Sequence, residues 1–209
     1  MAEKLRVNPN RMELLKLRRR LAIARRGHKL LKDKFDELMK PFLSMIKEAR
    51  NLREEVEREL GEAYQIFALV RSEASTAELE EALSTPSARA DIKVGKMNIV
   101  SVRVPTFELK MEGNFDCYGL SLTPSLLDEA LERYSSLLPR MVKLSQVENA
   151  LKQLAFEIER TRRRVNALEF VLIPQLEETI RFITMKLDEF ERANLTQLMK
   201  IKEMVAEAT

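Results

Sequence analysis

The residues that could carry covalent or metal chemistry are too few and too far apart to form an active centre. The 209-residue sequence holds one histidine, His28, and one cysteine, Cys117, which lie 89 positions apart. A nucleophile–histidine–acid triad and a zinc site each need several such side chains together. The five scattered glycines form neither of the phosphate-binding loops GxxxxGK[S/T] and GxGxxG. We therefore expect a protein that is not an enzyme in its own right and that holds no cofactor and no metal ion.

The charged residues are distributed unevenly along the chain. Residues 1–34 hold 12 Lys and Arg against three acidic residues, a net charge of +9, whereas the other 175 residues hold 24 basic and 30 acidic residues, a net charge of −6. This asymmetry predicts either that the N-terminal region contacts an acidic or phosphate-rich partner or that it is simply a solvated helix face. Residues 1–34 contain no Phe, Tyr or Trp, so the stacking surfaces of single-strand binders are missing and we expect no nucleic-acid partner.

Hydropathy argues for a soluble chain. No segment reaches 18 consecutive apolar residues, and the N-terminus has no apolar core of signal-peptide length. One cysteine rules out a disulfide framework and fits a reducing compartment. We expect a cytoplasmic protein without direct membrane insertion, whose contact with a membrane goes through other proteins.

The elements that must position these charges are long helices. Asn8-Pro9 predicts a helix start with Asn8 as the N-cap. From Leu14 to Val70, 17 positions alternate spacings of three and four residues, and 15 of them are apolar; the exceptions are His28 and Glu59. A seam of this length and regularity is typical of a coiled coil.

The C-terminal third repeats the pattern. A seam with spacings of three and four runs from Leu144 to Leu172 and, beyond Pro174, changes to an 11-residue pattern that continues to Val205. This change predicts that the last part of the second long helix is less supercoiled.

A connector separates the two seams. Residues 98–112 show β-branched alternation around Pro105, which predicts a β-hairpin with Pro105 in its turn. Thr123-Pro124 predicts the start of a short helix over 124–135. We expect three parts: an N-terminal helix over 1–83, the connector over 84–136, and a C-terminal helix over 137–209.

The predicted fold class is all-α and elongated, a long antiparallel two-stranded coiled coil with the small connector at its turn. Pairing the two chain ends gives facing residues whose numbers total about 215. Pro41 and Pro174 would then lie at one level and form a single bend; the alternative is that both are tolerated kinks without a mechanical role.

Two blocks of sequence resemble a known family. They are Arg25-Arg26-Gly27-His28-Lys29-Leu30-Leu31-Lys32-Asp33-Lys34, and Arg162-Arg163-Arg164-Val165-Asn166-Ala167-Leu168-Glu169 running into Ile173-Pro174. Both are similar to the D subunit of the V-type and A-type rotary ATPases, and the resemblance extends nearly end to end. Phe35 stands where that family usually has a basic residue.

The resemblance implies a rotor shaft, the central stalk of a rotary ATPase or ATP synthase. Such a shaft transmits torque between a ring of catalytic A and regulatory B subunits and a membrane ring that moves H⁺ or Na⁺. It also implies that both termini lie inside the A/B ring. The small F subunit would bind the lower part, and a funnel-like subunit (C/d) above the membrane ring would receive the base.

Two groups of basic residues become candidate contacts within this frame. A bearing surface against the ring is predicted for Arg11, Lys16, Arg18, Arg19, Arg20, Arg25 and Arg26. A basic collar of Arg162, Arg163 and Arg164 would touch the lower rim of the ring or the F subunit, or would instead form an interhelical ion-pair cluster near residues 51–57. A prefoldin-like coiled-coil chaperone, or another coiled-coil scaffold, is the alternative to the shaft, because prefoldin also joins two long helices by a β-hairpin.

Overall fold

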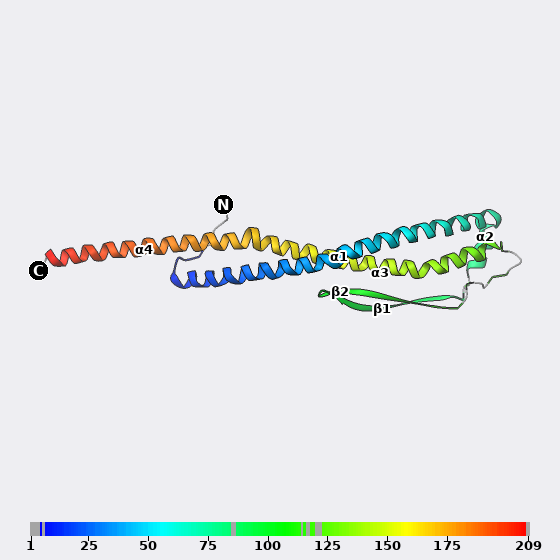
Figure 1. Ribbon diagram of the computed structural model, residues 1–209, viewed down its shortest axis with the longest axis horizontal. Helices are drawn as coiled ribbons and strands as arrows, with labels where there is room; N and C mark the ends of the chain where they lie inside the picture. The colour runs from blue at the N-terminus through cyan, green and yellow to red at the C-terminus, as the bar shows by residue number, and fades with distance from the viewer. Residues whose placement is uncertain are drawn as a thin grey trace. The chain divides into compact units, whose positions relative to one another are not determined.

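A computed structural model describes residues 5, 7–84, 87–113, 115, 118–119 and 123–207 (Figure 1). Its elements are α1 (Arg11–Glu73), α2 (Thr76–Leu83), β1 (Arg89–Ile99), β2 (Val102–Glu112), α3 (Leu126–Asn166), the π-helix η1 (Ala167–Leu172) and α4 (Ile173–Glu207). The predicted fold class is confirmed: two long helical halves are joined by a connector with a two-stranded hairpin and a short helix. Cys117 lies outside the described residues.

The chain divides into two compact units. Unit 1 combines Met1–Asp36 with Glu159–Thr209, and unit 2 is Glu37–Ile158. Each unit therefore pairs part of α1 with a helical segment from later in the chain. The three predicted parts, 1–83, 84–136 and 137–209, instead follow the order of the elements along the chain, and this division stays a prediction.

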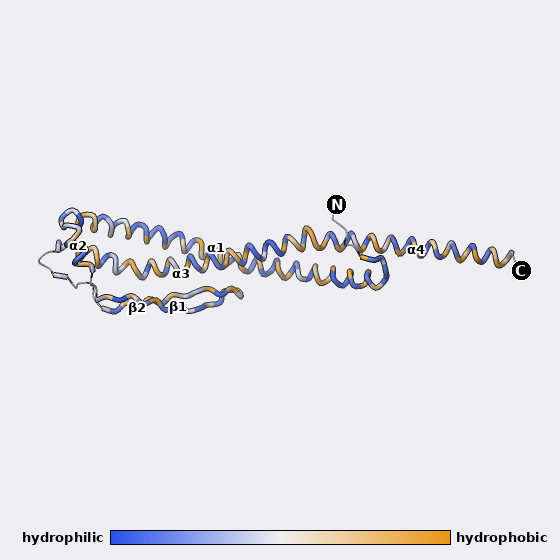
Figure 2. Tube along the Cα trace, turned by 180° about the vertical axis from the view of Figure 1, so that it is seen from behind, coloured by the Kyte–Doolittle hydropathy of each residue, from blue (hydrophilic) through white to orange (hydrophobic). Residues whose placement is uncertain are grey.

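The α1 seam has the burial that its spacing predicts. All 17 seam positions from Leu14 to Val70 are buried or half-buried, including His28 and Glu59. Figure 2 shows apolar residues recurring along the helices between hydrophilic ones. The start of α1 was predicted two residues too early: Asn10 caps the helix, because its Oδ1 accepts a 2.7 Å hydrogen bond from the Glu13 N–H.

The register of the helix pairs differs from the predicted one. In unit 1, Arg11 pairs with Glu191 and Arg25 with Glu177, and each pair of numbers totals 202. In unit 2, Arg53 pairs with Glu148, a total of 201, and Arg140 with Glu59, a total of 199. The predicted total of 215 is therefore wrong. The chain ends do not pair, because α4 continues for 16 residues beyond Glu191, the partner of Arg11 near the start of α1.

This register removes the reason for placing Pro41 and Pro174 at one level. The total of 202 in unit 1 sets Pro174 opposite about residue 28 of α1, whereas Pro41 belongs to unit 2. Both prolines lie within helical segments. A bend at either proline stays a prediction.

The hairpin turns at Val100-Ser101, not at Pro105. Both turn residues have positive φ, 46° and 68°, as a two-residue type I′ turn requires. Pro105 lies inside β2 opposite Lys96. Two residues on, the Phe107 N–H points away from β1 and donates to Gln146 Oε1 at 2.9 Å. Since alternate residues of a strand share a direction, the Pro105 nitrogen also faces outward and removes no ladder bond.

The connector packs against the helices of unit 2. Figure 1 shows the hairpin alongside α3, and β2 contacts this helix through the hydrogen bond from Phe107 to Gln146. Ser75 caps α2 through a reciprocal capping box with Glu78, and a small core of Val70, Leu79, Leu127 and Ala130 joins the end of α1 to α2 and α3. The short helix expected at 124–135 is the first part of α3, which continues without a break through Pro139 to Asn166.

Candidate interaction surfaces

The predicted bearing residues all lie on the first turns of α1 and are exposed. We call them the N-terminal basic surface: Arg11, Lys16, Arg18, Arg19, Arg20, Arg25 and Arg26. Three of them already have partners inside unit 1. Lys16 bonds Glu13 at 2.7 Å, Arg25 bonds Glu177 at 2.7 Å, and Arg11 pairs with Glu191. These three charges are partly neutralised within the chain.

The other four have no ion pair within the described part of the chain: Arg18, Arg19, Arg20 and Arg26. Arg19 and Arg26 are seven residues apart and fall on the side of α1 opposite the buried Leu17 and Ala24. Their guanidinium groups are therefore available to acidic groups of a partner.

Sequence reasoning missed the apolar residues that lie between these cations. Met12, Ile23 and Leu30 are each 69% exposed. With Arg19 and Arg26 they form an outer stripe on the side opposite the seam, in which apolar and basic side chains alternate. The signal was present, because Met12, Arg19 and Arg26 recur every seven residues and Ile23 and Leu30 are also seven apart. Such a surface can be held by apolar contact as well as by charge.

The second half of α4 carries another exposed stripe. Every described side chain from Asp188 to Ala206 is exposed. The predicted seam nevertheless continues through this segment, with Phe190, Leu198 and Ile201 between 51% and 62% exposed. We call these three residues the C-terminal stripe. It has the pattern of a coiled-coil seam, yet its side chains are exposed.

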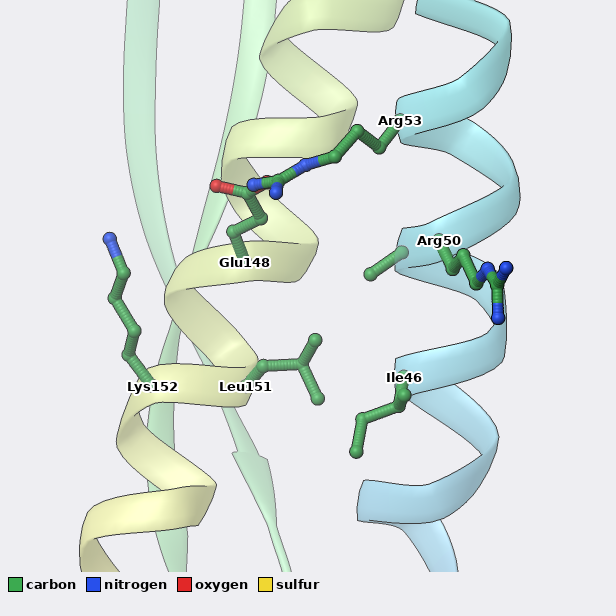
Figure 3. A pocket seen from close by; sticks show the side chains of 7 residues that line it. Ile46, Arg50, Arg53, Glu148, Leu151 and Lys152 are labelled. Atoms are coloured by element: carbon green, nitrogen blue, oxygen red, sulfur yellow. The ribbon is translucent and has the colours of Figure 1, made fainter.

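A groove in unit 2 lies between α1 and α3 (Figure 3). It measures about 390 Å³ and is lined by Ile46, Ala49, Arg50, Arg53, Glu148, Leu151 and Lys152. Ile46 and Leu151 point toward one another and form its apolar floor, while Arg50 and Lys152 point outward at its edges.

Arg53 closes one end of this groove by its bond to Glu148. The hydrogen bond and the charge of the Glu148 carboxylate raise the pKa of Arg53 above its ordinary value. Arg50 is held by Glu54 at 3.0 Å on its own helix. The groove, which we call the α1–α3 groove, is thus apolar at its base with a net positive rim.

The predicted collar lies at the end of α3. Arg162, Arg163 and Arg164 are all exposed, and Arg163 pairs with Glu159 one turn earlier on the same helix. Residues 51–57 were the expected ion-pair partners of the collar. Within them, Arg53 pairs with Glu148 and Glu54 pairs with Arg50 instead. The collar remains a candidate contact surface.

His28 lies at the α1 seam against η1. Its Nε2 is 3.4 Å from Glu169 Oε2, is buried, and makes no hydrogen bond within the described structure. The predicted total of 215 would instead have set His28 opposite Leu187. Among the described residues, no group of three or more His, Cys, Asp or Glu side chains is arranged to hold a metal ion.

No described helix has a stretch that is both long enough and apolar enough to cross a bilayer. The surfaces found on the described residues are exposed stripes, a shallow groove and clusters of basic side chains. They suit contacts with other macromolecules better than the binding and conversion of a small substrate.

Comparison with known proteins identifies the family. The family model for the D subunit of ATP synthase matches residues 13–203. The chain is 56% identical over 201 residues to the V-type ATP synthase D subunit of Thermoanaerobacter sp. (strain X514), covering 95% of this chain and 96% of that protein. It is 51% identical over 209 residues to the V-type ATP synthase D subunit of Clostridium botulinum (strain Langeland), covering 98% and 97%. Neither relative supports the chaperone alternative, and the chain belongs to the family of ATP synthase D subunits.

Proposed function

We propose that this chain is the central stalk of a V/A-type rotary ATPase. It would transmit torque between the A/B ring and the membrane ring that moves H⁺ or Na⁺. The observation that carries the proposal is the match of the family model over nearly the whole chain, with relatives named as D subunits of V-type ATP synthases. In this role the chain is non-catalytic and peripheral to the membrane as part of the complex.

The local structure suits mechanical transmission. Two antiparallel helices with a closed seam resist twisting, because a turn of one helix against the other would pull buried residues such as Leu38 and Leu154, both 0% exposed, out of their packing.

The N-terminal basic surface, the outer stripe and the C-terminal stripe all belong to unit 1, and we propose that they contact the A/B ring. Exposed ion pairs are worth about 0–1 kcal/mol each. Contacts of this strength hold a shaft by their number yet break one at a time as it turns. The exposed apolar residues add contact area without fixing one orientation.

We propose that the α1–α3 groove receives the F subunit. A groove with an apolar floor and cations at its edges fits an amphipathic helix whose apolar side enters the groove and whose flanks carry Asp or Glu. The end of unit 2 formed by α2 and the adjoining ends of α1 and α3 would rest on the funnel-like subunit, and the collar would touch the F subunit or the rim of the ring.

The test is reconstitution of the A/B ring with this chain and the F subunit. With both present, we expect a stable assembly, ATP hydrolysis, and unidirectional rotation of a bead attached through the Val100-Ser101 turn. The control is the same complete assembly without ATP, in which the attached bead should stay still. A complex that assembles and hydrolyses ATP while the attached bead stays still would contradict the shaft role.

A further inference from the structure

The π-helix η1 interrupts an otherwise α-helical path from Leu126 to Glu207. It comprises the six residues Ala167–Leu172, and at its end the Ile173 N–H donates to the Leu168 carbonyl, five residues back instead of four. A π-turn holds about one more residue per turn than an α-turn, and such turns are rare and short. The surrounding sequence or packing must therefore favour an extra residue within Ala167–Leu172.

The buried residues show what that is. Val147, Leu154 and Thr161 are buried and spaced by seven residues, and so are Leu176 and Ile183. Thr161 and Leu176, however, are 15 positions apart, one more than two heptads. The extra residue falls in the interval that contains η1.

The facing helix has no such excess. Leu17, Ala24, Leu31 and Leu38 of α1 keep a spacing of seven, and each is buried or half-buried. One helix of an antiparallel pair thus has one residue more than the other between equivalent buried positions. A single π-turn absorbs this residue and lets the buried rows before and after it keep facing α1.

Three local features favour a π-turn at η1 over other places in the helix. Pro174 follows directly, and a proline cannot donate to the carbonyl four residues back and crowds it, which favours an opened turn. On α1, His28 lies 3.4 Å from Glu169 within η1, and Arg25 bonds Glu177 just beyond it at 2.7 Å. Phe170 and Val171, in the middle of the turn, are 70% and 52% exposed and are not locked in a core.

We propose that η1 is a torsional joint built into this chain. The seam against α1 would close equally well without the extra residue. The backbone hydrogen bonds of η1 are the first in this helix to break and re-form. Moving the extra residue along the helix by one turn would rotate only the residues that the π-turn passes, while the seam before and after them stays against α1. The inference concerns the chain alone and does not depend on the proposed function.

Deletion of Val171 from the full-length chain tests the proposal, with deletion of Lys143 as the matched control. Val171 lies in η1, whereas Lys143 is an exposed residue in an ordinary α-turn of α3. Removing the excess residue should convert η1 to α-helix, so the Tm should stay within about 2 °C of the wild type or rise. Removing Lys143 creates a mismatch where none existed and should lower the Tm by more than about 5 °C. An equal loss of Tm in both variants would overturn the proposal.

Hydrogen exchange provides the second measurement. In the wild-type chain, the amides of Ala167–Leu172 should exchange at least about tenfold faster than those of residues 161–166. Deletion of Val171 should remove that difference. Equal protection of the two segments in the wild type would show that no joint opens there.

Pro174→Ala separates the joint from a simpler cause. If the mismatch in spacing creates the π-turn, fast exchange at Ala167–Leu172 should persist in this variant, because the extra residue is still present. If fast exchange disappears, η1 is only the response of the backbone to a proline, and the proposal is wrong.

Discussion

Arg18, Arg19 and Arg26 differ from Arg11 and Arg25 in one respect that matters for binding. All five are exposed on α1, but the first three have no ion pair within the described residues, whereas Arg11 and Arg25 are paired with glutamates of α4. A cation next to a carboxylate contributes little to the field at a distance. The attraction of the N-terminal basic surface for an acidic partner therefore comes mainly from its unpaired members.

We predict that the triple variant Arg18→Gln, Arg19→Gln, Arg26→Gln weakens assembly with the A/B ring about tenfold at low salt, the sum of several surface contacts of about 0–1 kcal/mol each. The control removes the same number of charges from the paired positions, as Arg11→Gln, Lys16→Gln, Arg25→Gln, and should have a smaller effect. Binding measured at two salt concentrations checks the cause, since the difference between the variants should shrink as screening increases. Equal affinities of the two triple variants at low salt would refute this account.

At the scale of the element, α4 places one apolar pattern in two environments. Leu176 is 0% exposed in the core of unit 1, whereas Leu198, on the same predicted seam, is 62% exposed. Burial, and not residue type, decides what each leucine contributes to the stability of the free chain.

We predict that Leu176→Ala lowers the free energy of unfolding by about 2–5 kcal/mol, because it removes buried methyl groups and leaves a cavity. Leu198→Ala should change it by no more than about 0.5 kcal/mol. Urea unfolding of the purified chain measures both. The same Leu198→Ala variant should bind the A/B ring more weakly, and a loss of stability in the free chain equal to that of Leu176→Ala would mean that the end of α4 is packed after all.

The elements also show how far sequence patterns reach. Spacing predicted which face of α1 is buried at every seam position, because periodicity depends only on neighbours along one helix. It did not predict the register, since sliding one helix by whole heptads leaves the pattern unchanged; the predicted total of 215 differs from 199–202 by about two heptads. The turn at Val100-Ser101 was missed because neither residue is the Gly or Asn that usually marks positive φ. The basic residues of the candidate surface were visible as charges, whereas their exposed apolar neighbours, which lie off the predicted seam, were missed.

At the scale of the molecule, the candidate surfaces divide between the two units. The N-terminal basic surface and both stripes belong to unit 1, and the α1–α3 groove belongs to unit 2. If these surfaces serve different partners, a substitution in one unit should leave the other contact intact.

We predict that Ile46→Glu reduces binding of the F subunit by at least about tenfold without changing the affinity for the A/B ring, because it places a charge in the apolar floor of the groove, where the apolar side of the bound helix would cover it. Leu43→Glu is the matched control, since Leu43 is another exposed apolar residue of α1, 53% exposed, that does not line the groove. The arginine triple variant should show the opposite selectivity. Pull-down of the F subunit and of the ring with each variant checks this, and a parallel loss of both partners would argue against separate sites.

The C-terminal stripe has a consequence for the life of the chain before assembly. A newly made copy carries Phe190, Leu198 and Ile201 exposed, and exposed apolar surface is what aggregation and cellular proteases act upon. The copies that persist are then those that find a partner to cover this segment. The amount of this protein in a cell would thereby follow the supply of its partners, without any dedicated control of its synthesis.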